Sequence, residues 1–170
     1  MITPIVKEPH TILHSKAVPV PEITPDIQKL IETMIETMHL ADGVGLAANQ
    51  IGSNLNILIA SADGKKGKEL VLLNASIQQR RGRAKSPEGC LSVPGVSADV
   101  ARSAEVTVSG LNQEGKPVII QADGLLAKIL QHEVDHLNGH LFLDRLSPWQ
   151  RKKVTQKYQA LSETLRRIRV

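Results

Sequence analysis

The chain has 170 residues, of which 41% are hydrophobic and 22% are charged, and its formal net charge is +4. This length suits one domain over residues 1–170, burying roughly two thirds of the surface that the unfolded chain exposes. The composition is that of a globular protein, and no apolar run reaches the ~20 residues of a membrane-spanning helix, so we expect no membrane partner.

The first twenty residues carry no recognisable export signal. They lack the continuous apolar core of a signal peptide, and Glu8 together with three prolines is unlike a transit peptide. The single cysteine, Cys90, excludes an intramolecular disulfide and fits a reducing compartment. We therefore expect a cytoplasmic protein.

The first predicted element is a helix that begins at Pro25. Thr24 is a suitable N-cap, and proline is favoured at the first helical position. Apolar residues then recur at helical spacing on one face, and the pattern ends near residues 41–43. This predicts an amphipathic helix whose apolar face packs against the core.

Strand-like runs occupy the middle of the chain. Three short apolar runs predict strands at residues 56–60, 69–74 and 105–111. The turn NQEGK follows the third run and leads back through residues 117–121, which predicts a β-hairpin.

The next predicted helix, residues 125–139, carries a candidate metal site. Apolar residues lie on most of its sides, which predicts a buried helix, and Gly139 is a suitable C-terminal cap. His132 and His136 are four residues apart, so both imidazoles face one side of the helix and could bind one ion. Glu133 could act as a general base on metal-bound water. Buried imidazoles and a buried carboxylate need partners, which favours a metal site over simple packing.

The final predicted helix, residues 147–170, is basic. Ser147 and Gln150 form a capping box at its start. The segment has seven Lys or Arg residues against Glu163, so its formal charge is +6 and the rest of the chain sums to −2. Charge alone favours a solvated helix face, and an attachment surface for an acidic partner stays open.

These elements predict an α+β fold. Antiparallel strands are expected to pack around a buried central helix that carries the His-Glu-x-x-His pattern, with an N-terminal helix and a basic C-terminal helix at the two ends. Strands that precede a late buried helix are unlike a repeated βαβ arrangement.

The third metal ligand has to come from outside the central helix. The metzincin pattern needs a histidine where Phe142 stands, and Glu163, the only glutamate after Glu133, lies among basic residues. Cys90 is the better candidate, because PEGCLSVPG surrounds it with glycine and proline and predicts a loop or bulge. A Cys-His-His set leaves one position open for water and suits a transition metal of zinc or ferrous type. Inert packing of a lone cysteine is the alternative.

Three motifs, taken in order, resemble those of the peptide deformylases. They are GVGLAANQ at residues 43–50, EGCLS at residues 88–92 and QHEVDH at residues 131–136. The resemblance covers nearly the whole chain. It implies an amide hydrolase that removes the N-formyl group from the initiator methionine of nascent polypeptides. It also implies one divalent metal ion, Fe²⁺ in the native protein, with Zn²⁺, Ni²⁺ or Co²⁺ able to take its place.

The resemblance also implies a role for each matched residue. Glu133 would act as general base and then acid during attack of metal-bound hydroxide, while Gln50 and the backbone N–H of Leu91 would stabilise the oxyanion. Three residues would bind the metal: Cys90, His132 and His136. Six would contact the substrate: Val44, Gly45, Gly89, Arg102, Leu125 and Ile129.

Two other functions stay open at the level of sequence. A metallopeptidase of another class would need a cleft that accepts peptide on both sides of the scissile bond. A non-catalytic ribosome-associated protein with this fold would not need Glu133 and Gln50, which are both present. Because a deformylase meets chains that leave the ribosome, the basic final helix is a candidate for attachment to ribosomal RNA phosphates.

Overall fold

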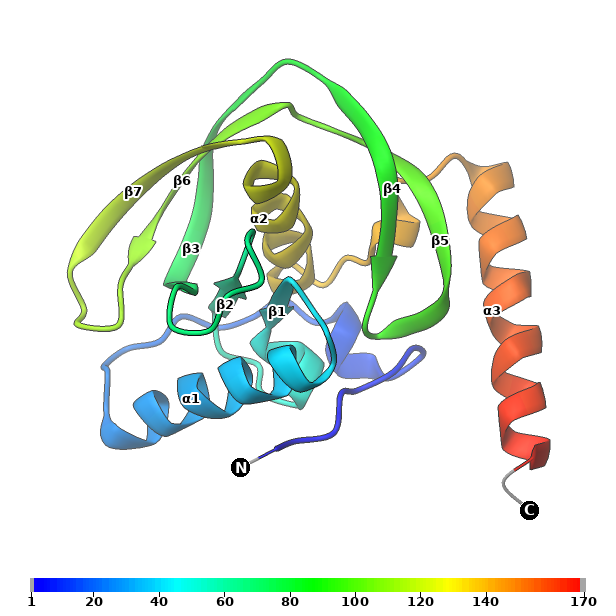
Figure 1. The fold of residues 1–170 in the computed structure, drawn as a ribbon, viewed down its shortest axis with the longest axis horizontal. Coiled ribbons are helices and arrows are strands. Elements are labelled where there is room, and N and C mark those ends of the chain that lie inside the picture. The colour runs from blue at the N-terminus through cyan, green and yellow to red at the C-terminus, as the bar shows by residue number, and fades with distance from the viewer. Residues whose placement is uncertain (1, 169–170) are drawn as a thin grey trace.

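The chain folds around one central helix, α2 (Gly124–Leu137), which antiparallel strands enclose (Figure 1). A computed structural model describes residues 2–168. One sheet has the strand order β1-β2-β3-β6-β7, and β4 and β5 form a second sheet. The arrangement confirms the predicted α+β class and the buried position of the His-Glu-x-x-His helix. The strands are β1 (Gly45–Ala47), β2 (Ile57–Ala60), β3 (Leu70–Arg81), β4 (Ala84–Cys90), β5 (Val93–Arg102), β6 (Glu105–Leu111) and β7 (Pro117–Asp123).

The two sheets are joined by a pair of bends. β3 passes into β4 through Gly82, and β5 returns into β6. Arg81 pairs with Glu105 on one side of the bends, and Ala84 pairs with Arg102 on the other. As a result β4 and β5 stand across α2 from β6 and β7 (Figure 1).

The strand predictions are correct for the apolar runs and incomplete elsewhere. The runs at 56–60, 69–74 and 105–111 correspond to β2, the first half of β3 and β6, and the predicted hairpin joins β6 to β7. The sequence did not predict β4 and β5. Their sequences, AKSPEGC and VPGVSADVAR, contain glycine or proline and bury few side chains, so the alternation that marks a strand is weak. The loop or bulge expected around Cys90 is a bulge between Glu88 and Cys90, at the end of the hairpin that β4 and β5 form.

The first helix, α1 (Pro25–Leu40), begins and ends as predicted. The hydroxyl of Thr24 accepts a hydrogen bond from the backbone N–H of Ile27 over 3.4 Å. Its apolar face places Ile31, Met34 and Met38 against β2 and the strands beside it, where all three are fully buried. This packing covers one face of the five-stranded sheet, while α2 covers the other (Figure 1).

The last helix, α3 (Pro148–Ile168), lies along the outside of β5 (Figure 1). The predicted capping box is present, since the Gln150 backbone N–H donates to the Ser147 hydroxyl over 3.3 Å and the Gln150 side chain accepts from Ser147. Tyr158 is its only buried residue among those described, and its hydroxyl donates to the carbonyl of Glu8 over 2.8 Å. Arg169, the last basic residue of the predicted helix, lies outside the described residues. No described helix is long and apolar enough to cross a bilayer.

Candidate metal centre

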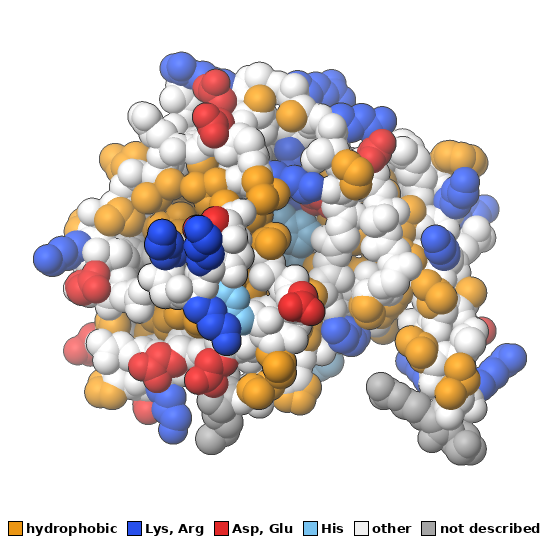
Figure 2. Space-filling model, viewed as in Figure 1, with side chains coloured by type: hydrophobic (Ala, Val, Ile, Leu, Met, Phe, Trp, Pro, Cys, Tyr) orange, Lys and Arg blue, Asp and Glu red, His pale blue; other side chains and the backbone are white. Residues whose placement is uncertain are grey.

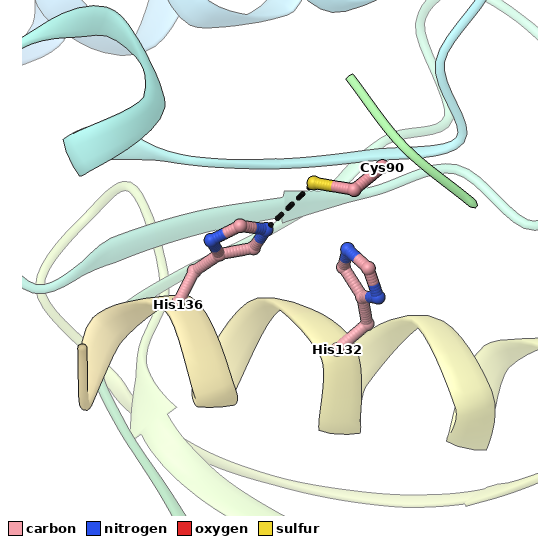
Figure 3. A group of neighbouring side chains, drawn as sticks. All are labelled: Cys90, His132 and His136. Atoms are coloured by element: carbon pink, nitrogen blue, oxygen red, sulfur yellow. Dashed lines mark hydrogen bonds between the residues drawn. The ribbon is translucent and has the colours of Figure 1, made fainter. Parts of the chain in front are cut away.

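Three side chains from two elements converge beside α2 (Figure 3). Cys90 ends β4, and His132 and His136 lie one turn apart on α2. One potential ligand atom from each residue lies within 4.8 Å of the others. Sγ of Cys90 is 3.2 Å from Nε2 of His136, and the two imidazole centroids are 5.0 Å apart. The predicted ligand set is therefore brought together, and no other such group of His, Cys, Asp or Glu occurs within residues 2–168.

The environment of Cys90 favours the thiolate that a metal requires. Burial would by itself raise the pKa of the thiol, but His136 and His132 hold it well below its usual value. Two N–H groups also point at the sulfur, the backbone N–H of Ser92 at 3.4 Å and Nε2 of Gln50 at 3.7 Å. One thiolate and two imidazoles suit a divalent transition metal and leave a coordination position for water. The donor set thus fits the metal expected from the sequence.

Glu133 lies beside the three ligand residues and is on the same helix, α2, as His132 and His136. It is buried, and its Oε2 has no hydrogen-bond partner among the described residues. Burial raises the pKa of its carboxyl group, and the neighbouring His132 and His136 oppose that shift. An unpartnered buried carboxylate with a raised pKa is suited to taking up and releasing a proton.

Gln50 is held so that its amide nitrogen faces Cys90. Its Oε1 accepts a hydrogen bond from the backbone N–H of Ala47 over 2.9 Å, which assigns Nε2 to the opposite side. From there Nε2 donates to the hydroxyl of Ser92 over 3.2 Å and approaches the Cys90 sulfur. The side-chain donor expected at the oxyanion position is therefore adjacent to the metal ligands.

A buried ion network supports His132 from behind. Nδ1 of His132 lies 3.0 Å from Oε2 of Glu88, whose other contacts come from Arg102 through Nε (2.5 Å) and Nη2 (2.9 Å). Arg102 also donates to Asp135 over 2.9 Å, and Asp135 receives two further hydrogen bonds from Arg145. Burial would raise the pKa of Glu88, but the hydrogen bonds from His132 and Arg102 lower it to about 2. This network was missed at the sequence level, where the only signal was the glutamate two residues before Cys90.

The guanidinium of Arg102 is engaged behind His132. Arg102 is 9% exposed, it does not line the cleft in front of the metal ligands, and Glu88 and Asp135 occupy its guanidinium. A contact between Arg102 and the substrate stays a prediction. In the structure its charge lies behind His132, because two buried carboxylates need a cation there.

The cleft in front of the metal ligands has a volume of about 620 Å³. Figure 2 shows a histidine surface in a hollow near the middle of this face, bordered by hydrophobic side chains. Lys7 and Lys128 also line the cleft and were not expected there. The ammonium of Lys128 donates to the carbonyl of Pro87. Five of the six predicted substrate contacts line it: Val44, Gly45, Gly89, Leu125 and Ile129.

Comparisons with known proteins agree with the motifs. A family model described as polypeptide deformylase matches residues 2–152. The peptide deformylases of Aquifex aeolicus and Thermodesulfovibrio yellowstonii are each 42% identical to the chain, with 95% and 93% of the chain and 97% of each relative covered. The crystal structure of a peptide deformylase from Legionella pneumophila matches with a TM-score of 0.93 at 41% identity, covering 98% of this chain and 99% of that one.

Proposed function

The chain belongs to the peptide deformylase family, and we propose that its Cys90-His132-His136 cluster is the metal centre at which it removes the N-formyl group from newly made polypeptides. Members of this family are hydrolases that act on N-formylmethionyl peptides. The observation that carries the proposal is the convergence of the three ligand residues at a cleft beside the unpartnered carboxylate of Glu133.

Cys90, His132 and His136 would hold one divalent metal ion. When bound, the ion supplies a Lewis acid that polarises the formyl oxygen and makes a nucleophile available near neutral pH. Fe²⁺ is the native metal we propose, and Zn²⁺, Ni²⁺ or Co²⁺ would occupy the same site, because one thiolate and two imidazoles accept all of them. The hydrogen bond from Nδ1 of His132 to Glu88 supports binding through Nε2.

Glu133 would carry the proton during hydrolysis. Water adds to the formyl carbon, the C–N bond breaks, and the products are formate and a free amine. Glu133 takes the proton from the attacking water and donates it to the leaving nitrogen, a role that its raised pKa and unpartnered Oε2 support. It needs no ligand role, since its neighbours on α2 already provide two.

The oxyanion that develops on the formyl group would be stabilised by two donors. Nε2 of Gln50 is aimed toward the metal ligands by the hydrogen bond from Ala47, and the backbone N–H of Leu91 follows directly after Cys90. A preorganised donor of this kind typically contributes about 3 kcal/mol to the transition state.

The substrate would lie extended in the cleft. Backbone groups of Val44, Gly45 and Gly89 line it, and both glycines allow a peptide to approach closely. The methionine side chain would lie against the apolar side chains of Leu125 and Ile129 on α2. This arrangement would suit a peptide whose first residue, the formylated methionine, lies at the metal centre.

Three wider assignments accompany this function. We propose that residues 1–170 act as one domain, since α2 contacts the large sheet by packing and the small sheet through Glu88. Because the substrate is a nascent polypeptide, we propose a cytoplasmic enzyme. We also propose that the basic helix α3 attaches to the ribosome surface, where its exposed cations would meet RNA phosphates.

The activity is tested by incubating the metal-loaded protein with formyl-Met-Ala-Ser and, separately, with an unformylated peptide that contains an internal Met-Ala bond. Formate release from the first and no cleavage of the second supports deformylation. Cleavage of the internal bond would indicate a metallopeptidase, and no reaction with either would indicate a non-catalytic protein.

A further inference from the structure

A second cavity of about 370 Å³ lies behind the ion network that supports His132. We call it the arginine pocket, since four arginines line it: Arg80, Arg83, Arg102 and Arg145, together with Gln131 and Asp135. It is distinct from the deformylation cleft, because the two have no lining residue in common. The ion pair between Arg102 and Glu88 links them.

Strand register explains why a charged side chain reaches this cavity. Arg80 on β3 pairs with Val106 on β6, and directly paired residues point to the same face of a sheet. Val106 is buried in the core that α2 helps to form, so Arg80 points to the inner side. Its neighbour Arg81 pairs with Glu105 and points to the other face, because successive side chains alternate. Arg81 accordingly does not line the arginine pocket.

The acceptors in the arginine pocket are already used. Both oxygens of Asp135 accept hydrogen bonds from arginines, Oδ2 from Arg102 and Arg145 at 2.9 Å each and Oδ1 from Arg145 at 2.5 Å. Oε1 of Gln131 accepts from the backbone N–H of Ser103 over 3.0 Å, and the Gln131 amide nitrogen donates to two backbone carbonyls. The carboxylate and amide oxygens of the arginine pocket are therefore all engaged.

The donors are in surplus. Each guanidinium has five N–H groups. Arg102 uses three of them and Arg145 two, while the side chains of Arg80 and Arg83 make no hydrogen bond or ion pair with any described residue. Asp135 and Glu88 together balance two of the four positive charges. A concave site with spare N–H groups and unbalanced positive charge is complementary to a compact polyoxyanion.

We propose that the arginine pocket is a binding site for a phosphoryl group. A tetrahedral phosphoryl group offers several acceptor oxygens in different directions and can therefore bind more than one guanidinium at once. Two sources have this chemistry, free phosphate and the phosphodiester backbone of RNA. Both would be held chiefly by Arg80 and Arg83, the two arginines without another partner.

The test titrates inorganic phosphate into the zinc-loaded protein at constant ionic strength, followed by amide NMR. Saturable shifts at Gly82, Ala101 and Ser103, without matching shifts at Gly45 and Gly89 in the cleft, are expected. Arg80→Ala/Arg83→Ala should weaken this binding about tenfold or more, because two charge-assisted contacts are lost. Arg81→Ala/Lys85→Ala removes the same charge from the same bend between β3 and β4 and should change the binding less than about twofold.

A short single-stranded RNA, measured by fluorescence anisotropy, separates the two sources. RNA binding that phosphate displaces and that only Arg80→Ala/Arg83→Ala weakens would identify a phosphodiester as the ligand. Phosphate binding without such RNA binding would identify free phosphate. The proposal is overturned if phosphate causes no saturable shift around Gly82, or if both double variants weaken it equally. None of these outcomes depends on deformylation, so failure here leaves the proposed function untouched.

Discussion

Glu88 accepts a hydrogen bond from Nδ1 of His132 over 3.0 Å, which leaves Nε2 of that imidazole to bind a metal ion. The same carboxylate is fixed by two hydrogen bonds from Arg102. The orientation of one metal ligand is therefore set by a β4 residue and a β5 residue, neither of which is itself a ligand.

This relationship predicts that Glu88→Ala weakens metal binding about 10- to 100-fold, because His132 loses the partner that fixes its tautomer and ring orientation. Competition with a chromophoric chelator measures the change. Glu88→Gln keeps an acceptor for Nδ1 and should fall between the parent and Glu88→Ala. Parent-like affinity in a folded Glu88→Ala protein would show that Glu88 does not support the site.

The low pKa of Glu88, about 2, predicts an acid-sensitive fold. Because the value in the folded protein lies below the ordinary 4.5, the carboxylate stabilises the fold above pH 4.5, and this is lost as pH falls toward 2. One pKa unit corresponds to about 1.4 kcal/mol, so this group contributes on the order of 3 kcal/mol. For Asp135, burial opposes the shift, but Arg145 and Arg102 lower the pKa and add to the same trend.

Urea unfolding of the chelator-treated protein, between about pH 6 and about pH 3, measures this dependence. The free energy of unfolding should fall with pH more steeply for the parent than for Glu88→Gln, and the difference between them should shrink as Glu88 is protonated. A difference that is the same at every pH would contradict the assignment.

The sequence predicts the central helix and the two metal ligands on it well, since the apolar pattern, the spacing of the histidines and the capping glycine all lie within residues 125–139. Cys90 could be chosen as the third ligand from its motif, and a bulge there could be expected from the flanking glycine and proline, but the strand β4 that it ends could not be predicted. β4 was missed because lysine, proline and glycine weaken the strand pattern.

The ion network behind His132 could not be predicted either, and the reason is different. Glu88, Arg102, Asp135 and Arg145 come from β4, β5, α2 and η3 (Phe142–Arg145), and only the packed fold brings them together. The same cause explains why the ion pairs of Arg102 were not expected. A motif match can indicate that a residue matters, but it cannot indicate which side of α2 the residue serves.

Mutations of the metal ligands and of the proposed proton carrier should have different effects. Cys90→Ser and His132→Ala should each lose most of the metal, because a three-ligand site has no spare donor and a hydroxyl binds such ions far more weakly than a thiolate. Glu133→Ala should keep metal and fold while turnover of formyl-Met-Ala-Ser falls by several orders of magnitude. Metal content by mass spectrometry and formate release decide both. A Cys90→Ser protein with the metal content of the parent would contradict the ligand role of Cys90. Loss of metal in Glu133→Ala would contradict the assignment of Glu133 as a proton carrier that is not a ligand.

The proposed ribosome attachment predicts a salt-sensitive interaction through α3. Arg151 is paired with Asp144 and Lys153 lies over Trp149, so neutralisation is best directed at exposed cations without these contacts. Changing Lys152, Lys157, Arg166 and Arg167 to Gln should reduce co-sedimentation with ribosomes and leave turnover of a short formyl-peptide nearly unchanged, since none of these four residues lines the cleft.

A matched variant controls for the loss of charge. Lys65, Lys66, Lys68 and Lys116 are exposed residues outside α3, and changing them to Gln removes the same charge. Ribosome binding should then persist. If the two variants bind equally, or if the parent does not co-sediment at low salt, α3 is simply a solvated surface.

Gly45→Ala should impair catalysis through steric contact with the proton carrier. A Cβ atom at this position would overlap Oε1 of Glu133 and lie 2.8 Å from Cγ2 of Ile129. Since the backbone of Gly45 does not have a positive φ, alanine adds no backbone strain, and the cost falls on the position of Glu133. Displacing a catalytic group by about 1 Å costs roughly 100-fold in rate, so we expect kcat to drop by about that factor with metal content unchanged.

Gly89→Ala is the matched control, because Gly89 also lines the cleft but a Cβ atom there would meet only the carbonyl of Val96 at 3.6 Å. It should alter KM rather than kcat, and a Gly45→Ala enzyme with the parent kcat would show that Glu133 does not depend on this close approach.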